Sequence, residues 1–282
     1  MEINVNSLSY TYLAKTPNSV EALHNISLKI PSGKITTIVG HTGSGKSTLV
    51  QTMNALISPT SGSVEVGEFV ITNNLKKLKK IKELRKHVAM VFQFPEYQLF
   101  EETVEKDVAF GLKNYGYKDE EALSKAHEAL KHVGIDESFY KRSPFELSGG
   151  EKRRVAIAGI IAIEPEVLIL DEPTAGLDPR GSKIILDLIL RLNKEGKTII
   201  IVTHDMNIVM NYSDHVIVLN EGFVAFTGSP SELFSGDVAS YSIDIPKLYE
   251  LSLLLKEHGV KINIDSIRNI DDLFSQLKEL KR

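Results

Sequence analysis

The chain has 282 residues, of which 42% are hydrophobic and 25% charged, so it is neither disordered, collagen-like nor fibrous, and its length suits two domains or one large α/β domain with an appendage. The 33 basic and 37 acidic residues give a formal charge of -4, so no global charge favours nucleic acid or anionic lipid, and the lack of cysteine excludes disulfides, thiolate metal sites and thiol catalysis. The sequence shows no secretory signal and no apolar run near the ~20 residues of a membrane span.

The pattern of apolar residues predicts an α/β fold. Residues 3–12 and 26–30 alternate apolar and polar side chains, which is typical of half-exposed antiparallel strands. Four short runs rich in β-branched residues predict buried strands, at 35–39, 88–92, 167–170 and 198–202. Amphipathic stretches separate these runs, so we expect a mixed, largely parallel sheet with helices on both faces and ligands at the carboxyl edge of its strands.

A phosphate-binding loop follows the first buried run. Residues 40–47 match the pattern G-x-x-x-x-G-K-[ST] at every fixed position, in the strand-loop-helix context that the motif requires. Backbone N–H groups of such a loop converge on phosphate oxygens, Lys46 reaches the β- and γ-phosphates, and the Ser47 hydroxyl binds Mg²⁺. The residues predicted to bind ATP here are Gly40, His41, Thr42, Gly43, Ser44, Gly45, Lys46, Ser47 and Thr48.

The basic run at 76–86 has two interpretations. It could contact lipid headgroups or nucleic acid, or it could be a solvated helix face, because Leu75, Leu78, Ile81 and Leu84 recur every three residues and would bury one side. The second interpretation is the more common one in a chain without net positive charge.

The next region, about 94–165, is expected to be a mostly helical insertion. Acidic residues at 119–121 begin one helix, alanines and Leu130 supply its apolar stripe, and Gly134 ends it. After about residue 228 the strand pattern stops, and stretches at 248–257 and 271–281 indicate helices of a small C-terminal extension.

Two acids end the run at 167–170. Paired with a phosphate loop, Asp171 is the expected carboxylate that holds Mg²⁺ through water. Glu172 is then placed to accept a proton from, or to orient, the water that attacks the γ-phosphate.

One further motif gives the chain a strong resemblance to the ATP-binding cassette (ABC) ATPases. Ahead of the acidic strand lie Leu147, Ser148, Gly149, Gly150 and Glu151, which match the family signature with Glu151 where Gln is common. Ser148 is a good N-cap for the helix that follows, and a helix N-terminus can receive an anion. The resemblance implies that this anion is the γ-phosphate of ATP on a second subunit, so that two nucleotides lie between two cassettes.

The same resemblance assigns roles at four other positions. Gln93 matches the glutamine that senses Mg²⁺ and the attacking water, and His204 matches the switch histidine that contacts the γ-phosphate and organises Glu172. Asp178 matches the aspartate that communicates across the dimer. Tyr12 matches the aromatic residue that stacks on adenine, although Tyr10 lies on the same strand and is the alternative. Without the other motifs, Gln93 would be interpreted as a surface amide and His204 as a structural histidine.

Residues 92–104 and 107–111 narrow the resemblance to the second ATPase (A2 type) of energy-coupling factor transporters. Such transporters pair two similar ATPases beneath a transmembrane coupling protein, which joins interchangeable substrate-binding membrane proteins that import vitamins or transition-metal ions. The resemblance implies an ATP-binding domain at 1–228, in which an antiparallel β subdomain and the helical insertion accompany the mixed sheet. It also implies an extension at 229–282 that contacts the other ATPase, and a peripheral position on the cytoplasmic face of the membrane. The segment after Gln93 would contribute to the groove that receives the coupling protein.

The predicted function is therefore ATP hydrolysis with Mg²⁺ that drives micronutrient import. One alternative is a soluble ABC-type ATPase that acts on nucleic acid, against which stand the short helical insertion and the lack of a long coiled coil. Another is a small-molecule kinase, which would leave Ser148 and His204 without a purpose. No nucleic acid partner is expected, and recognition of the imported substrate is expected to lie in a separate membrane protein.

Overall fold

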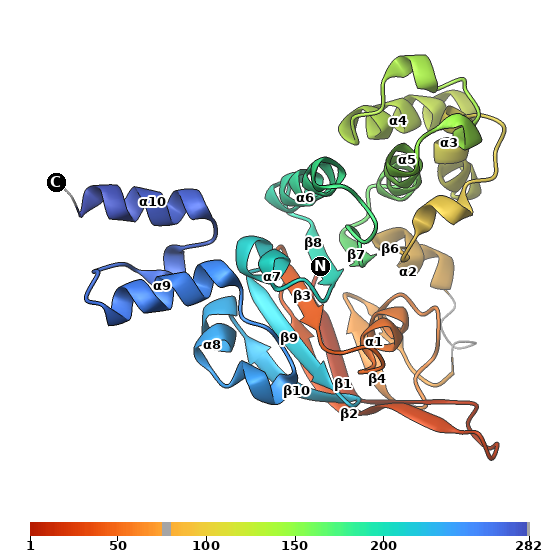
Figure 1. The fold of residues 1–282 in the computed structure, drawn as a ribbon. Helices are drawn as coiled ribbons and strands as arrows, with labels where there is room; N and C mark the ends of the chain where they lie inside the picture. Colours follow the sequence, from red (N-terminus) through yellow and green to blue (C-terminus); the bar gives the residue numbers. More distant parts are fainter. Residues whose placement is uncertain (75–79, 281–282) are drawn as a thin grey trace.

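The computed structural model describes residues 1–74 and 80–280, which form two sheets with helices packed around them (Figure 1). An antiparallel sheet has the order β2-β1-β4-β5, and a six-stranded sheet has the order β10-β9-β3-β8-β7-β6. The first sheet consists of β1 (Ile3–Tyr12), β2 (Val20–Ile30), β4 (Ser61–Val66) and β5 (Phe69–Ile71). The second consists of β3 (Ile35–Val39), β6 (Val88–Val91), β7 (Val167–Asp171), β8 (Thr198–Val202), β9 (His215–Asn220) and β10 (Phe223–Gly228).

The six-stranded sheet is mixed, as predicted, but its antiparallel member was not foreseen. Strands β6, β7, β8, β3 and β9 pair in parallel, and only β10 runs antiparallel, as the hairpin partner of β9. The alternating strands β1 and β2 belong to the separate antiparallel sheet, which agrees with the expected antiparallel β subdomain. All residues of β3, β6, β7 and β8 are buried, which explains their unbroken apolar runs. Helices cover one face of the sheet, whereas the antiparallel sheet and the first helix after β3 cover the other, so the expectation of helices on both faces holds only in part.

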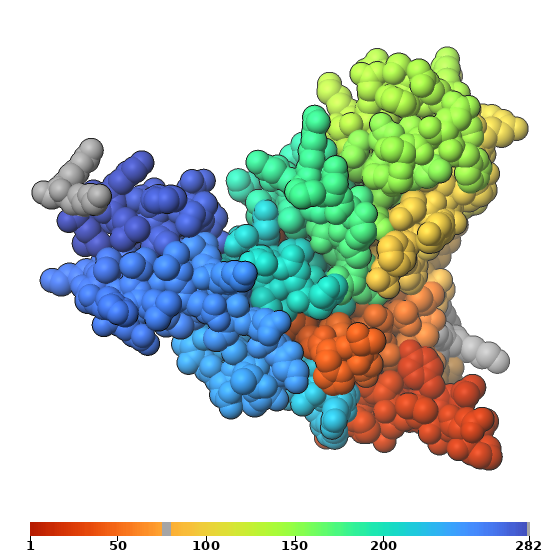
Figure 2. Space-filling model, in the orientation of Figure 1, coloured from red at the N-terminus to blue at the C-terminus, as the bar shows by residue number. Residues whose placement is uncertain are grey.

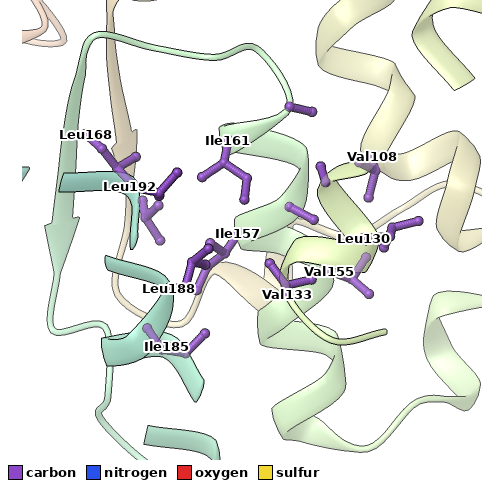
Figure 3. Packing of buried hydrophobic residues seen from close by; sticks show 14 of the residues in the cluster. Val108, Leu130, Val133, Val155, Ile157, Ile161, Leu168, Ile185, Leu188 and Leu192 are labelled. Carbon is purple, nitrogen blue, oxygen red and sulfur yellow. The ribbon is translucent and has the colours of Figure 1, made fainter. Parts of the chain in front are cut away.

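The helical insertion packs around α5 (Gly149–Ile161), which also contacts the core. It contains the short helix η2 (Pro95–Gln98), α3 (Val104–Asn114) and α4 (Asp119–His132), with 3-10 turns at Glu137–Phe139 and Pro144–Glu146. Figure 3 shows that Val155 faces Val108 and Leu130 of the insertion, whereas Ile157 and Ile161 of the same helix face α6 (Pro179–Lys194) and β7. Helix α5 is therefore apolar on two sides and joins the insertion to the sheet.

Part of the basic run packs on the insertion. Helix α2 (Ile81–His87) buries Leu84 completely, and the ammonium groups of Lys82 and Lys86 lie 5.6 and 5.4 Å from the ring centres of Tyr115 and Tyr117. Cation–π contacts of this kind favour the solvated-face interpretation for the described part of the run. Residues 75–79, including Leu75 and Leu78, lie outside the described residues.

The C-terminal extension shares a hydrophobic core with the sheet. It comprises α8 (Pro230–Ser235), a 3-10 turn at Val238–Tyr241, α9 (Lys247–Glu257), a turn at Ile264–Ser266 and α10 (Ile270–Glu279). Its buried residues Phe234, Ile262 and Leu273 belong to one cluster with Val39 and Val218 of the sheet, and α7 (Met206–Tyr212) contributes as well. Figure 2 shows the extension and the helical insertion as two lobes that project from the core in different directions.

The described helices show no membrane span: among residues 1–74 and 80–280, none is both long enough and apolar enough to cross a bilayer.

Candidate nucleotide-binding site

The loop between β3 and α1 (Lys46–Met53) has the backbone of a phosphate cradle. Gly40, Gly43 and Gly45 all have positive φ, at 145°, 85° and 97°. A Cβ at Gly40 would lie 2.1 Å from the carbonyl oxygen of Leu219, so no side chain fits there. A Cβ at Gly43 would meet nothing within 4 Å, so the loop is open beside this residue.

Two side chains of the loop fit a bound phosphate. The Ser44 hydroxyl is buried and has no hydrogen-bond partner within the described part of the chain, so it is available to an oxygen-rich ligand. The Lys46 ammonium donates to the carbonyl oxygens of Gly40 and His41 at 2.7 and 2.8 Å, which holds the loop closed. Burial lowers the pKa of Lys46, although the nearby carboxylates of Glu172 and Asp171 act in the opposite direction.

The expected magnesium ligands face one another. The Ser47 hydroxyl, in the first turn of α1, donates to Asp171 Oδ2 at 2.9 Å across the gap between α1 and the end of β7. Burial raises the pKa of Asp171, and Glu172 adds to this effect, while the Ser47 hydrogen bond and Lys46 oppose it. A hydroxyl and a carboxylate are oxygen ligands of the kind that Mg²⁺ prefers, so these residues fit that ion.

Glu172 and His204 form a hydrogen-bonded pair at the same sheet edge. His204 Nδ1 lies 2.7 Å from Glu172 Oε1, and the Glu172 side chain is only 15% exposed. Glu172 has φ 50°, a conformation that costs free energy in a non-glycine residue, and its N–H donates to the carbonyl oxygen of Val202. The backbone thus fixes this carboxylate at the end of β7, and His204 fixes its orientation.

These groups line one cavity of about 710 Å³. Gln93, at the end of β6, lines it together with Lys46, Ser47, Asp171 and Glu172. The cavity is further lined by Tyr12, Val20, Glu21, Ala22, Thr42, Gly43, Gly45, Thr48, Val202, His204, Glu221 and Gly222. The carboxyl ends of β6, β7 and β8, the β9–β10 turn and the loop after β3 therefore converge, which is the arrangement expected at the carboxyl edge of an α/β sheet, and β1 and β2 add residues from the antiparallel sheet.

The two candidate tyrosines differ in position. Tyr12 lines the cavity, and its hydroxyl lies 2.9 Å from the Thr48 hydroxyl. Tyr10 packs instead against the apolar core beneath the antiparallel sheet, and its ring meets that of Tyr12 edge to face at 4.7 Å. The geometry favours Tyr12 as the residue that would stack on a base.

The signature residues lie in a separate cavity. Ser148 caps α5 and forms a capping box, in which its N–H and hydroxyl donate to Glu151 Oε2 at 2.8 and 2.6 Å. These hydrogen bonds hold the pKa of Glu151 below its usual value. Ser148, Gly150 and Glu151 line a cavity of about 530 Å³ with Asp178, and this cavity contains no residue of the phosphate cradle.

The remaining signature and dimer positions have local structural roles. Leu147 is buried in the core of the insertion, and a Cβ at Gly149 would meet no atom within 4 Å. Asp178 caps the N-terminus of α6, where Oδ1 accepts a hydrogen bond from the Gly181 N–H at 2.7 Å.

Sequence reasoning missed one pair of charged residues, which joins α5 to η2. Arg153 of α5 is 2% exposed and forms an ion pair with Glu96 of η2. The signal was present, because Arg153 lies four and eight residues before Ile157 and Ile161 on the apolar face of the helix. A charged residue on such a face indicates a buried partner.

The fold and the site together define a phosphate-loop nucleoside triphosphatase: a glycine loop after a buried strand, with two acids at the end of a nearby strand. Comparison with known proteins identifies the family of nucleoside triphosphatases to which the chain belongs. Residues 23–175 match the family described as ABC transporter.

Curated relatives cover almost all of the chain. The energy-coupling factor transporter ATP-binding protein EcfA2 of Mycoplasma capricolum is 50% identical over 99% of this chain and 98% of the relative. EcfA2 of Enterococcus faecalis is 56% identical over 83% of this chain and 81% of the relative.

Solved structures agree with these matches. The structure described as cbiO1 from Clostridium perfringens, part of the ABC transporter complex cbiONQ, has a TM-score of 0.73 and 40% identity, covering 90% of this chain and 98% of the other. A dimeric ATP-binding cassette, MJ0796 bound to ADP and Pi, has a TM-score of 0.71 and 31% identity, covering 81% and 98%. The chain therefore belongs to the ABC transporter ATP-binding family and, within it, to the energy-coupling factor ATP-binding proteins of the A2 type.

Proposed function

We propose that this chain binds and hydrolyses ATP as one ATPase subunit of an energy-coupling factor importer for vitamins or other micronutrients. The observation that carries the proposal is the convergence of Lys46, Ser47, Asp171, Glu172 and His204 on one cavity. In this proposal the cradle binds the phosphates, and Ser47, Asp171 and Gln93 hold Mg²⁺, which neutralises charge on the β- and γ-phosphates.

The proposed chemistry relies on positioning and proton transfer. Glu172 accepts a proton from the attacking water, and His204, hydrogen-bonded to the same carboxylate, keeps it oriented toward the γ-phosphate. Lys46 and the N-terminus of α1 stabilise the charge that develops on the phosphate oxygens. No covalent intermediate is required.

The experiment that tests this assignment is Glu172→Gln in the assembled transporter. Loss of the proton acceptor is expected to reduce turnover by roughly 10²- to 10⁴-fold. Calorimetry should show ATP bound as in the wild type, since the cradle is unchanged. The matched control is Glu195→Gln, the same change at an exposed acid after α6, which should keep wild-type turnover. Normal hydrolysis by Glu172→Gln would refute the assignment of the base.

A pair of cassettes is proposed as the active unit. The Ser148 cavity and the cradle are separate in one chain, so a second, homologous ATPase is needed to place a signature helix against each nucleotide. The dimeric cassette that this chain resembles, bound to ADP and Pi, supports the proposal. We assign the contact between the ATPases in part to the extension, where Leu251, Leu254, Ile270 and Phe274 are exposed.

The proposed membrane partners dock beside Gln93. The insertion exposes several aromatic side chains, among which the rings of Phe94 and Tyr97 and those of Phe100 and Phe110 lie close together, and Phe145 is exposed as well. Such a surface fits the apolar side of cytoplasmic helices from a transmembrane coupling protein, which in turn carries the substrate-binding membrane proteins. The name of the cbiONQ complex supports an assembly of this kind. In this proposal the chain lies peripherally on the cytoplasmic face of the membrane. A nucleic-acid ATPase is not favoured.

A further inference from the structure

Arg153 makes a two-point contact with the segment that follows Gln93. Its Nε and Nη2 donate to the two carboxylate oxygens of Glu96 at 3.0 and 2.9 Å. The Glu96 side chain is 17% exposed and that of Arg153 2% exposed, so water screens the pair only weakly. A planar guanidinium bound at both carboxylate oxygens fixes the orientation of η2 on α5, which a single-point contact would not do.

The third nitrogen of the same side chain contacts a different loop. Arg153 Nη1 donates to the carbonyl oxygen of Ala175, in the turn that leads from β7 to Asp178. The Ala175 N–H in turn donates to the carbonyl oxygen of Glu172 at 3.2 Å. One buried side chain therefore lies between η2 and the turn that begins at the proposed base.

Phe94 adds a second link between the same two segments. Its ring centre lies 5.3 Å from Arg153 Cζ, within the range of a cation–π contact. A Cβ built on Gly176 would lie 3.8 Å from the Phe94 ring, so the ring packs directly on the turn. Phe94 and Gly176 both have positive φ, which shows that both backbones are bent at this contact.

We infer that Arg153 is a positioning residue that ties η2 to the turn carrying Ala175 and Asp178, so that a displacement of one segment displaces the other. The inference rests on the proposed function, because η2 lies in the proposed docking surface and the turn links Glu172 to the dimer contact. The tie is strong because parting Glu96 from Arg153 would leave a buried, uncompensated charge.

Two variants separate this role from a structural one. Arg153→Lys keeps the positive charge, but its single ammonium group cannot reach Glu96 with two nitrogens and Ala175 with a third. Glu96→Gln keeps the shape of the side chain and removes the charge. The control is Lys113→Met, which removes an exposed ion pair with Asp119 elsewhere in the insertion. Far-UV circular dichroism and the melting temperature show that each full-length variant is folded.

The first measurement is hydrogen–deuterium exchange in the isolated full-length chain. In Arg153→Lys we expect exchange of peptides covering 173–178 to rise at least several-fold, while peptides covering the cradle at 40–48 and the affinity for ATP remain as in wild type. Lys113→Met should leave both regions unchanged. Wild-type exchange at 173–178 in folded Arg153→Lys overturns the inference, whatever the complex transports.

The second measurement is the number of ATP molecules hydrolysed per substrate imported by the assembled complex in vesicles. Both Arg153→Lys and Glu96→Gln are expected to raise this ratio several-fold, since hydrolysis continues while its link to the docking surface is weakened. A ratio equal to wild type in both variants contradicts the inference. A wild-type complex that hydrolyses no ATP contradicts the proposed function instead, and the exchange result then decides the inference alone.

Discussion

The Asp171 side chain, which is proposed to bind Mg²⁺, lowers the stability of the folded protein when it is charged and no nucleotide is bound. Its raised pKa means that folding disfavours the charged carboxylate relative to the unfolded chain, so the charged form costs stability. This cost is absent below the pKa of Asp171 in the unfolded chain. It grows as the pH rises from that pKa to the higher pKa in the folded protein. The nucleotide-free protein should therefore lose stability in that window, and Mg²⁺ with ATP should restore it.

Asp171→Asn tests this balance. The amide oxygen can still accept the Ser47 hydrogen bond, and the buried charge is removed, so we expect the nucleotide-free chain to gain about 1 kcal/mol of stability. Denaturant unfolding measures the gain, and thermal shift measures the expected loss of the further stabilisation that Mg²⁺ and ATP together give the wild type. A nucleotide-free variant that is less stable than wild type would contradict the argument.

Glu151 carries a negative charge at the N-terminus of α5, where the γ-phosphate of ATP on the second ATPase is proposed to bind. In the described structure its carboxylate accepts from both donors of Ser148. Glu151→Gln keeps an oxygen acceptor for the capping box and removes the charge from the N-terminus of α5. We expect the ATP concentration for half-maximal hydrolysis by the paired ATPases to fall about two- to fivefold. An unchanged or higher concentration would show that Glu151 does not compete with the phosphate.

At the scale of elements, helix α5 joins the insertion to the sheet, because it packs against both. Ile157 is fully buried, and Figure 3 shows it beside Leu188 of α6. Ile157→Ala should cost about 2–5 kcal/mol of unfolding free energy, measured with urea, because it leaves a cavity at this joint. Ile160→Ala, at a partly buried position of the same helix, should cost less. Equal losses would mean that the joint is not tightly packed.

The elements differ in how well the sequence predicts them. Runs such as 35–39 and 198–202 are unambiguous, because a strand covered on both faces must be apolar throughout. Their partners are less visible. No residue of β10 is fully buried, so the strand carries little apolar pattern, and which sheet β1 joins depends on contacts distant in sequence. The glycine loop and the acid pair are local motifs, so the sequence shows them directly. The Arg153–Glu96 pair spans 57 positions, and its only trace in the sequence is a charged residue on the apolar face of a helix.

At the scale of the whole molecule, the extension is part of the folding unit of the ATPase core. Val216 and Val218 of β9 and Val39, the residue before the cradle, are fully buried in the cluster that the extension completes. A fragment that ends at residue 228 would expose this surface. We expect it to melt at a lower temperature than the full chain and to aggregate.

The comparison needs the full chain at equal concentration, with light scattering to detect aggregation and calorimetry to measure ATP binding. We expect weaker binding by the fragment, because Val39 anchors the strand that leads into Gly40. A fragment that is monomeric, with the melting temperature and ATP affinity of the full chain, would show that the extension serves only contacts between subunits.

The separation of the two cavities has a genetic consequence. If each nucleotide is shared by two chains, a lesion in the cradle and a lesion at Ser148 of this one chain damage different nucleotides. If this gene carries both mutations, both ATP sites of the ATPase pair are damaged. If instead this gene carries the Ser148 mutation and the gene of the second ATPase carries the cradle mutation, both mutations affect the same ATP site. The other ATP site stays intact.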